Sequence, residues 1–110
     1  MVEKGRGEMV MNFTNAIGEP AMLEQLAEEC IELAHACLKL ARVERGESPT
    51  PVTLDEARRK VVEEMADMSV PQAAIWETDW FNPVIFDEFV MQKTARFEER
   101  LKTVERCTNR

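Results

Sequence analysis

Residues 20–43 read PAMLEQLAEECIELAHACLKLARV, and this stretch sets the fold class. Apolar side chains recur in it at alternating steps of three and four residues, which is the period of one face of an α-helix; they are Leu23, Leu26, Cys30, Leu33, Cys37 and Leu40. Pro20 suits the first helical position, because its missing N–H would have no helical partner there. The pattern predicts an amphipathic helix that starts after Gly18 and runs to about Val43.

A second helix is predicted after the Gly- and Pro-containing loop at residues 44–51. Thr53 and Glu56 have the spacing of a capping box, in which each side chain satisfies a backbone N–H at the helix end. The expected buried residues of this helix are Leu54, Ala57, Val61, Met65 and Met68. Pro71 cannot donate to the carbonyl of Asp67, so we expect it to kink or end the helix.

A third helix is predicted near the end of the chain. Residues 72–76 could extend the second helix before a break at residues 78–82. Asn82 and Pro83 then suit a cap and a first helical position, opening a helix from Val84 to about Arg106. Its apolar seam is Phe86, Phe89 or Val90, Phe97, Leu101 and Val104.

Composition and charge limit the class of protein. The chain has 110 residues, 21 of them acidic and 14 basic, for a formal net charge of −7, which argues against binding a nucleic acid polymer. No apolar run approaches the roughly 20 residues that cross a bilayer, so we expect a cytoplasmic protein without membrane contact. The three cysteines have no CxxC spacing, which speaks against a zinc site or a disulfide framework.

These patterns together predict an all-α protein with one folded domain. We expect an arm or short helix over residues 1–17, a single helical domain over residues 18–106, and a tail over residues 107–110. The first helix also carries a second apolar sector, formed by Ala27, Ile31, Ala34 and Leu38. A helix that is apolar on two sides in so short a chain predicts a homo-oligomer, either a homodimer or a homotetramer.

The most informative residues are two carboxylate pairs, Glu29 with Glu32 and Glu64 with Asp67. A spacing of three places both carboxylates of a pair on one side of a helix, one turn apart. Each pair lies on the same-handed edge of its apolar seam, so antiparallel packing of the two helices would bring all four together.

Four neighbouring carboxylates repel one another unless a cation lies among them, and oxygen ligands on rigid helices suit Mg²⁺ or Mn²⁺. Such ions commonly bridge protein carboxylates and phosphates. The simpler alternative is a solvated acidic surface. Another reading pairs Glu32 with His35 as the Glu-x-x-His element of a di-iron bundle, but such a site needs two of these elements and the chain has one histidine.

Basic side chains could complement such a centre. Lys93, Arg96 and Arg100 form a stripe beside the apolar seam of the last helix, and Lys39 lies on the acidic side of the first. Lysine and arginine at these positions could bind a polyphosphate, or could form ordinary surface ion pairs.

At these residues the sequence resembles the MazG-like nucleotide pyrophosphohydrolases, all-α enzymes with an ExxE helix followed by an ExxD helix. The matching segments are Glu28-Glu29-Cys30-Ile31-Glu32 and Glu63-Glu64-Met65-Ala66-Asp67, and the similarity continues into the basic segment at residues 93–101. The resemblance implies a helical bundle of the all-α NTP pyrophosphatase type, completed by oligomerisation. It also implies Mg²⁺-dependent hydrolysis of a nucleoside triphosphate to the monophosphate and pyrophosphate.

By the same resemblance, the metal ligands would be Glu29, Glu32, Glu64 and Asp67, and Glu28 or Glu63 would be a supporting catalytic acid. Lys39, Lys93, Arg96 and Arg100 would contact phosphate, and Trp76, Trp80 and Phe81 would stack on the base, unless these aromatics only pack in a core or an interface. The remaining alternatives are a non-catalytic helical dimerisation module and a degenerate member of the family.

Overall fold

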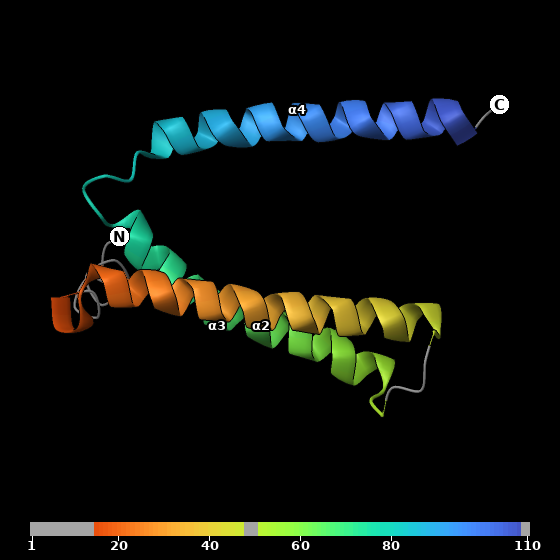
Figure 1. Ribbon diagram of the computed structural model, residues 1–110, viewed down its shortest axis with the longest axis horizontal. Coiled ribbons are helices and arrows are strands. Elements are labelled where there is room, and N and C mark those ends of the chain that lie inside the picture. Colours follow the sequence, from red (N-terminus) through yellow and green to blue (C-terminus); the bar gives the residue numbers. More distant parts are fainter. Residues whose placement is uncertain (1–14, 48–50, 109–110) are drawn as a thin grey trace. The chain divides into compact units, whose positions relative to one another are not determined.

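The computed structural model describes residues 15–47 and 51–108. Within these ranges it contains three long helices, α2 (Glu19–Arg45), α3 (Leu54–Trp76) and α4 (Pro83–Thr108), and residues 15–17 are also helical (Figure 1). The described chain has no strand, which confirms the predicted all-α class. A bundle completed by oligomerisation stays a prediction. Apart from residues 15–17, the arm expected over residues 1–17 lies outside the described residues.

Both ends of α2 are set by glycine backbone geometry. Gly18 precedes the helix with φ 87°, and Pro20 occupies its first turn, as predicted. Gly46 follows with φ 64°, a left-handed conformation that glycine adopts without steric cost. The N–H of Gly46 donates to the Val43 carbonyl at 3.2 Å, so a free carbonyl of the last turn is satisfied.

Side-chain caps open the other two helices at the predicted positions. The hydroxyl of Thr53 accepts a hydrogen bond from the N–H of Glu56 at 3.1 Å. The Asn82 side-chain oxygen accepts from the N–H of Val84 at 2.9 Å. These contacts satisfy backbone donors that have no partner within the helix, so they localise where each helix begins.

Pro71 does not end α3, and the expected end there is wrong. The helix continues through Pro71 to Trp76, and the Pro71 side chain is fully buried. Proline removes one backbone hydrogen bond, but the turn that follows buries Ala74 and Ile75. Burial of apolar surface on this turn offsets the lost bond.

The helices fall into two compact units that divide between Thr78 and Asp79, inside the range that the sequence assigned to one domain. The first unit holds α2 and α3, which run antiparallel and side by side (Figure 1), and the second holds α4. Helix α4 reaches Thr108, further than the predicted end near Arg106, so Cys107 and Thr108 are helical and not part of a tail. None of the described helices is long and apolar enough to span a membrane. The three cysteines are exposed, free thiols.

The interface between α2 and α3 confirms part of the predicted seam: Leu26, Leu33 and Leu40 of α2 are covered, and so are Leu54, Ala57, Val61 and Met68 of α3. Covered positions also include Met22, Glu29 and Ala36 on α2, and Glu64, Pro71, Ala74 and Ile75 on α3. Leu23, Cys30 and Cys37, which the sequence placed in the seam, are exposed, and Met65 is 53% exposed. Small residues such as Ala36 and Ala57 let the helices approach closely, which selects a face that apolar periodicity alone does not resolve.

Candidate metal centre

Two acids lie inside the helix interface, each one residue before a predicted seam residue that is exposed, Cys30 or Met65. Glu29 on α2 and Glu64 on α3 occupy seam positions that would otherwise hold apolar side chains. Glu64 is 4% exposed and Glu29 is half-buried, whereas Asp67, one turn beyond Glu64, is exposed. A buried carboxylate is costly unless it is paired or coordinates a metal.

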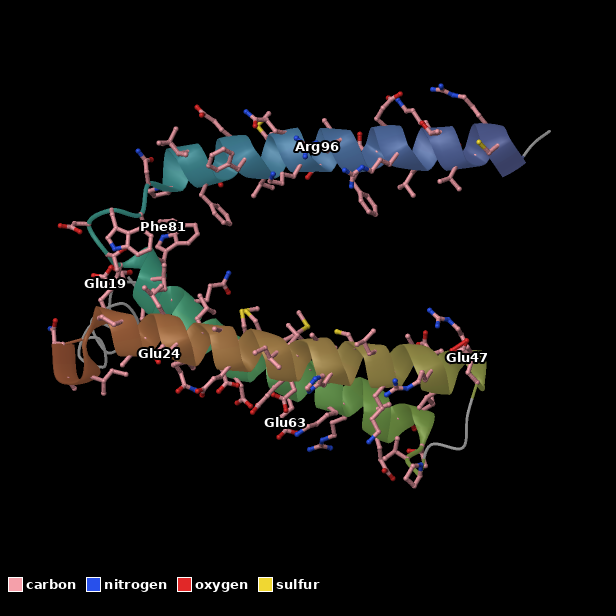
Figure 2. The ribbon with its side chains drawn as sticks, viewed as in Figure 1. Glu19, Glu24, Glu47, Glu63, Phe81 and Arg96 are labelled. Carbon is pink, nitrogen blue, oxygen red and sulfur yellow. The ribbon has the colours of Figure 1, made fainter. Side chains whose placement is uncertain are left out.

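Carboxylate oxygens of Glu29, Glu64 and Asp67 all lie within 4.8 Å of one another. Figure 2 shows carboxylate oxygens along the edge of the helix pair near the labelled Glu63. Glu32 belongs to the same electrostatic cluster, because the negative charge of Glu29, followed by that of Glu64, raises its pKa above the ordinary 4.5. The two predicted pairs therefore converge in space, while their role as ligands stays a prediction.

Two oxygens of this cluster have no hydrogen-bond partner. Gln25 Nε2 donates to Glu29 Oε1 at 2.7 Å, and Lys60 Nζ lies 2.9 Å from Glu64 Oε1. The other oxygen of each carboxylate, Oε2, is buried and unpartnered among the residues that the structure describes. Native proteins rarely leave buried acceptors unsatisfied, and a bound ion is one way to satisfy such a group. The all-oxygen donor set fits a hard divalent cation.

Lys60 is a functional candidate that sequence reasoning missed. Its ammonium group bonds Glu64 and lies 3.8 Å from Glu63, and these two carboxylates raise its pKa and keep it charged. A Lys60–Glu64 spacing of four residues on one helix is the signal that could have identified it. Lys60 supplies one positive charge against the four carboxylates of the cluster, so it only partly compensates them.

Two pockets flank the carboxylates along the α2·α3 pair. A polar pocket of about 400 Å³ is lined by Glu32, His35, Ala36, Lys39, Lys60 and Glu64. A second pocket of about 350 Å³ has Glu29 and Asp67 at its edge and apolar walls that include Met22, Val70 and Pro71. Each pocket thus shares two of the four carboxylates. Of the predicted phosphate ligands, the first unit holds Lys39, which lines the polar pocket.

The remaining predicted site residues lie elsewhere. Glu28 and Glu63 are exposed and line neither pocket. Lys93, Arg96 and Arg100 are on α4, in the second unit, where Lys93 lines an apolar groove with Phe86 and Phe97. Trp76 is exposed at the end of α3, and Trp80 and Phe81 belong to the second unit, where the Phe81 ring lies 5.5 Å from that of Phe86. The base slot and the α4 phosphate contacts therefore stay predictions.

Comparisons with protein-family models, with curated proteins and with solved structures find no match to this chain. The resemblance to MazG-like enzymes thus stands on the two acidic segments and the basic segment at residues 93–101.

Proposed function

We propose that the protein is a Mg²⁺-dependent nucleoside triphosphate pyrophosphohydrolase, which cleaves a nucleoside or deoxynucleoside triphosphate to the monophosphate and pyrophosphate. One observation carries the proposal. Glu64 is buried in the helix interface, one of its oxygens has no partner among the described residues, and Glu29 and Asp67 lie within 4.8 Å of its carboxylate. A stable helix pair would hold an apolar residue there unless the carboxylate had a ligand.

Glu29, Glu32, Glu64 and Asp67 would hold the cation, for which Mn²⁺ is the other candidate. A bound Mg²⁺ supplies charge neutralisation for phosphate oxygens and lowers the pKa of a coordinated water. Two acids would come from each helix, so the site depends on the antiparallel pairing of α2 and α3.

Glu32 suits the role of proton acceptor. Its side chain is exposed and lines the polar pocket, so a carboxylate oxygen that the cation does not use could accept a proton from a water molecule there. The attacking water would give one proton to Glu32, its oxygen would bond to the α-phosphorus, and the bond from that phosphorus to the bridging oxygen would break. Pyrophosphate would leave with the electron pair of that bond.

The apolar pocket beside Glu29 and Asp67 offers a place for the base. Ile17 and Val70 are exposed and provide apolar contact surface, and Gln25 carries an amide that can hydrogen-bond a base edge. In the proposal this pocket replaces the aromatic slot that the sequence suggested, because it shares two carboxylates with the metal centre.

The test is pyrophosphate release from a panel of deoxynucleoside and ribonucleoside triphosphates with Mg²⁺. We expect Glu64→Gln and Asp67→Asn to lower kcat/KM by about 10²-fold or more, as loss of a transition-state charge contact does. Glu24→Gln on α2 and Asp55→Asn on α3 are matched controls, because they remove exposed carboxylates outside both pockets and should leave kcat/KM within about twofold. A wild-type protein that releases no pyrophosphate from any of these nucleotides would contradict the proposal.

A non-catalytic dimerisation module is the second candidate, favoured by the exposed apolar sector on α2. Ile31 and Leu38 are 56% and 59% exposed and lie on the side that faces away from the α3 seam. Sedimentation of wild type and Ile31→Ser/Leu38→Ser tests this: an oligomer that dissociates in the variant supports association through this sector. The two functions are separable, because association alone predicts no Mg²⁺-dependent hydrolysis.

A further inference from the structure

Chemically different side chains follow one another along the α2·α3 pair. Apolar walls come first, at Met22 and Pro71, the carboxylate cluster follows, and then come the nitrogen-bearing side chains of His35, Lys39 and Lys60. A site for a cation therefore lies directly beside a pocket that can carry positive charge. A phosphoanhydride that binds together with a divalent cation needs both features: carboxylates that hold the cation, and positive charge that contacts the phosphate oxygens.

The polar pocket takes its nitrogens from both helices. His35 and Lys39 are four residues apart, so they lie on one side of α2, and Lys60 comes from α3. Lys39 is half-buried and makes no ion pair with any residue that the structure describes. Lys60 is bonded to Glu64, but its side chain is 55% exposed, which leaves the ammonium group within reach of a ligand in the pocket.

We propose that this pocket binds the pyrophosphate group, both as the terminal phosphates of the substrate and as the leaving product, and that Lys60 exchanges Glu64 for it. The inference rests on the proposed function for its choice of phosphoanhydride as ligand. Lys39 and Lys60 are then phosphate-binding residues, and the metal cluster lies between them and the pocket for the base.

The charges of the pocket make binding sequential. Its two carboxylates, Glu32 and Glu64, balance its two ammonium groups, so the pocket does not attract an anion by itself. A divalent cation on the carboxylates adds two positive charges and competes with Lys60 for Glu64. The pocket becomes positive, and the freed lysine is available to phosphate oxygens, so the cation has to bind before or together with the anion.

The same order along the helices predicts how a nucleotide lies. Its base would extend towards Met22 and Pro71 and its terminal phosphates towards Lys39, with the bond that breaks over the carboxylates. Lysine suits the end of the site where pyrophosphate leaves, because its ammonium group stands on a flexible side chain that can move with the product.

Isothermal titration calorimetry with inorganic pyrophosphate, at saturating Mg²⁺, tests the pocket directly. We expect Lys39→Met and Lys60→Met each to weaken pyrophosphate binding by about tenfold or more, because each removes a charged hydrogen-bond donor. Arg59→Met is the matched control: it removes the same charge from the same helix, one residue away and outside the pocket, and should change the affinity by less than about twofold.

A second titration, with Mg²⁺ alone, separates Lys60 from a residue that merely supports the fold. Lys60→Met should tighten Mg²⁺ binding by about two- to fivefold, because an internal competitor for Glu64 is lost. Opposite changes in the two affinities cannot come from a general loss of structure. Circular dichroism of each variant checks that the helices remain.

The inference is overturned if both lysine variants bind pyrophosphate as the wild type does, or if Arg59→Met loses as much affinity as they do. Its failure and that of the proposed function are distinguishable. Nucleotide hydrolysis that persists with unchanged pyrophosphate affinity in the lysine variants leaves the function and removes this pocket. Lysine-dependent pyrophosphate binding in a protein that hydrolyses no nucleotide retains the pocket and removes the function.

Discussion

The α2·α3 pair and α4 have similar sequence patterns, but their apolar seams differ in how far they are covered. Both regions have apolar residues at steps of three and four, interrupted by charged side chains. In the pair, Glu29 and Glu64 lie inside a covered seam. In α4, Lys93 interrupts a stripe that includes Phe86 and Phe97, and residues 79–108, the described part of this unit, hold no second helix.

The difference shows that a charged side chain within an apolar seam is desolvated only where another helix covers it. Lys93 is exposed in the α4 unit. Glu64 is 4% exposed, so its charge must be satisfied by Lys60, by a metal ion or by both. The following predictions probe this contrast.

The largest effect is expected from removing apolar contacts in the pair. Met22 is buried against Ala74, and Met22→Ala should lower the free energy of unfolding by about 2–3 kcal/mol through lost burial and a cavity. Met91 on α4 is 72% exposed, and Met91→Ala should cost less than about 0.5 kcal/mol. Urea unfolding followed by circular dichroism measures both. Equal costs would show that α4 is as well covered as α2.

Replacing the charge in each seam by leucine should sharpen the contrast. In EDTA, Glu64→Leu should raise the free energy of unfolding by about 1–2 kcal/mol, because it replaces a buried carboxylate that lacks one partner with an apolar side chain. Lys93→Leu should change it by less than about 0.5 kcal/mol. The same Glu64→Leu variant should lose the stabilisation that Mg²⁺ gives the wild type. A destabilised Glu64→Leu protein would mean that the Lys60–Glu64 pair outweighs the desolvation of the carboxylate.

The smallest effect concerns pH and Glu32. The folded protein holds the Glu32 proton more tightly than the unfolded chain, because neighbouring carboxylates raise the pKa above 4.5. Without metal, Glu32 therefore disfavours folding above its raised pKa, and this penalty disappears as the pH falls towards 4.5. Glu32→Gln should be more stable than wild type in EDTA at about pH 7.5, with a gap that narrows towards about pH 5. Thermal unfolding at both pH values measures the gap, and saturating Mg²⁺ should reverse it at the higher pH.

Sequence reasoning located helix ends better than helix faces. The predicted helix starts are confirmed. Two of them are marked by side chains that cap the helix, Thr53 and Asn82, and one by Pro20, which lacks the N–H that would have no helical partner. Seam positions such as Leu33 and Met68 were predicted correctly, but Glu29 and Glu64 are covered where Cys30 and Met65 were expected. The helix that Pro71 was expected to kink or end does not end there. A face is chosen by the partner helix, and the partner's contribution is not contained in local periodicity.

The candidate site divides in the same way. Two acids three residues apart on each of two consecutive helices are visible in the sequence, and so is their tendency to converge. Three features follow only from packing. Glu64 is buried with an unpartnered oxygen, Lys60 bonds its other oxygen, and a polar and an apolar pocket flank the cluster. The sequence also offered Trp76 as a base contact, although it lines neither of these pockets.

By itself, the sequence determined the all-α class, the three long helices and their caps, and the four carboxylates that define the candidate centre, because each depends on residues within one or two helical turns. The tertiary structure decided which of those residues lose contact with water. Desolvation depends on the neighbouring helix: it buries Glu64 beside Lys60, whereas Glu24 on α2 stays exposed to water.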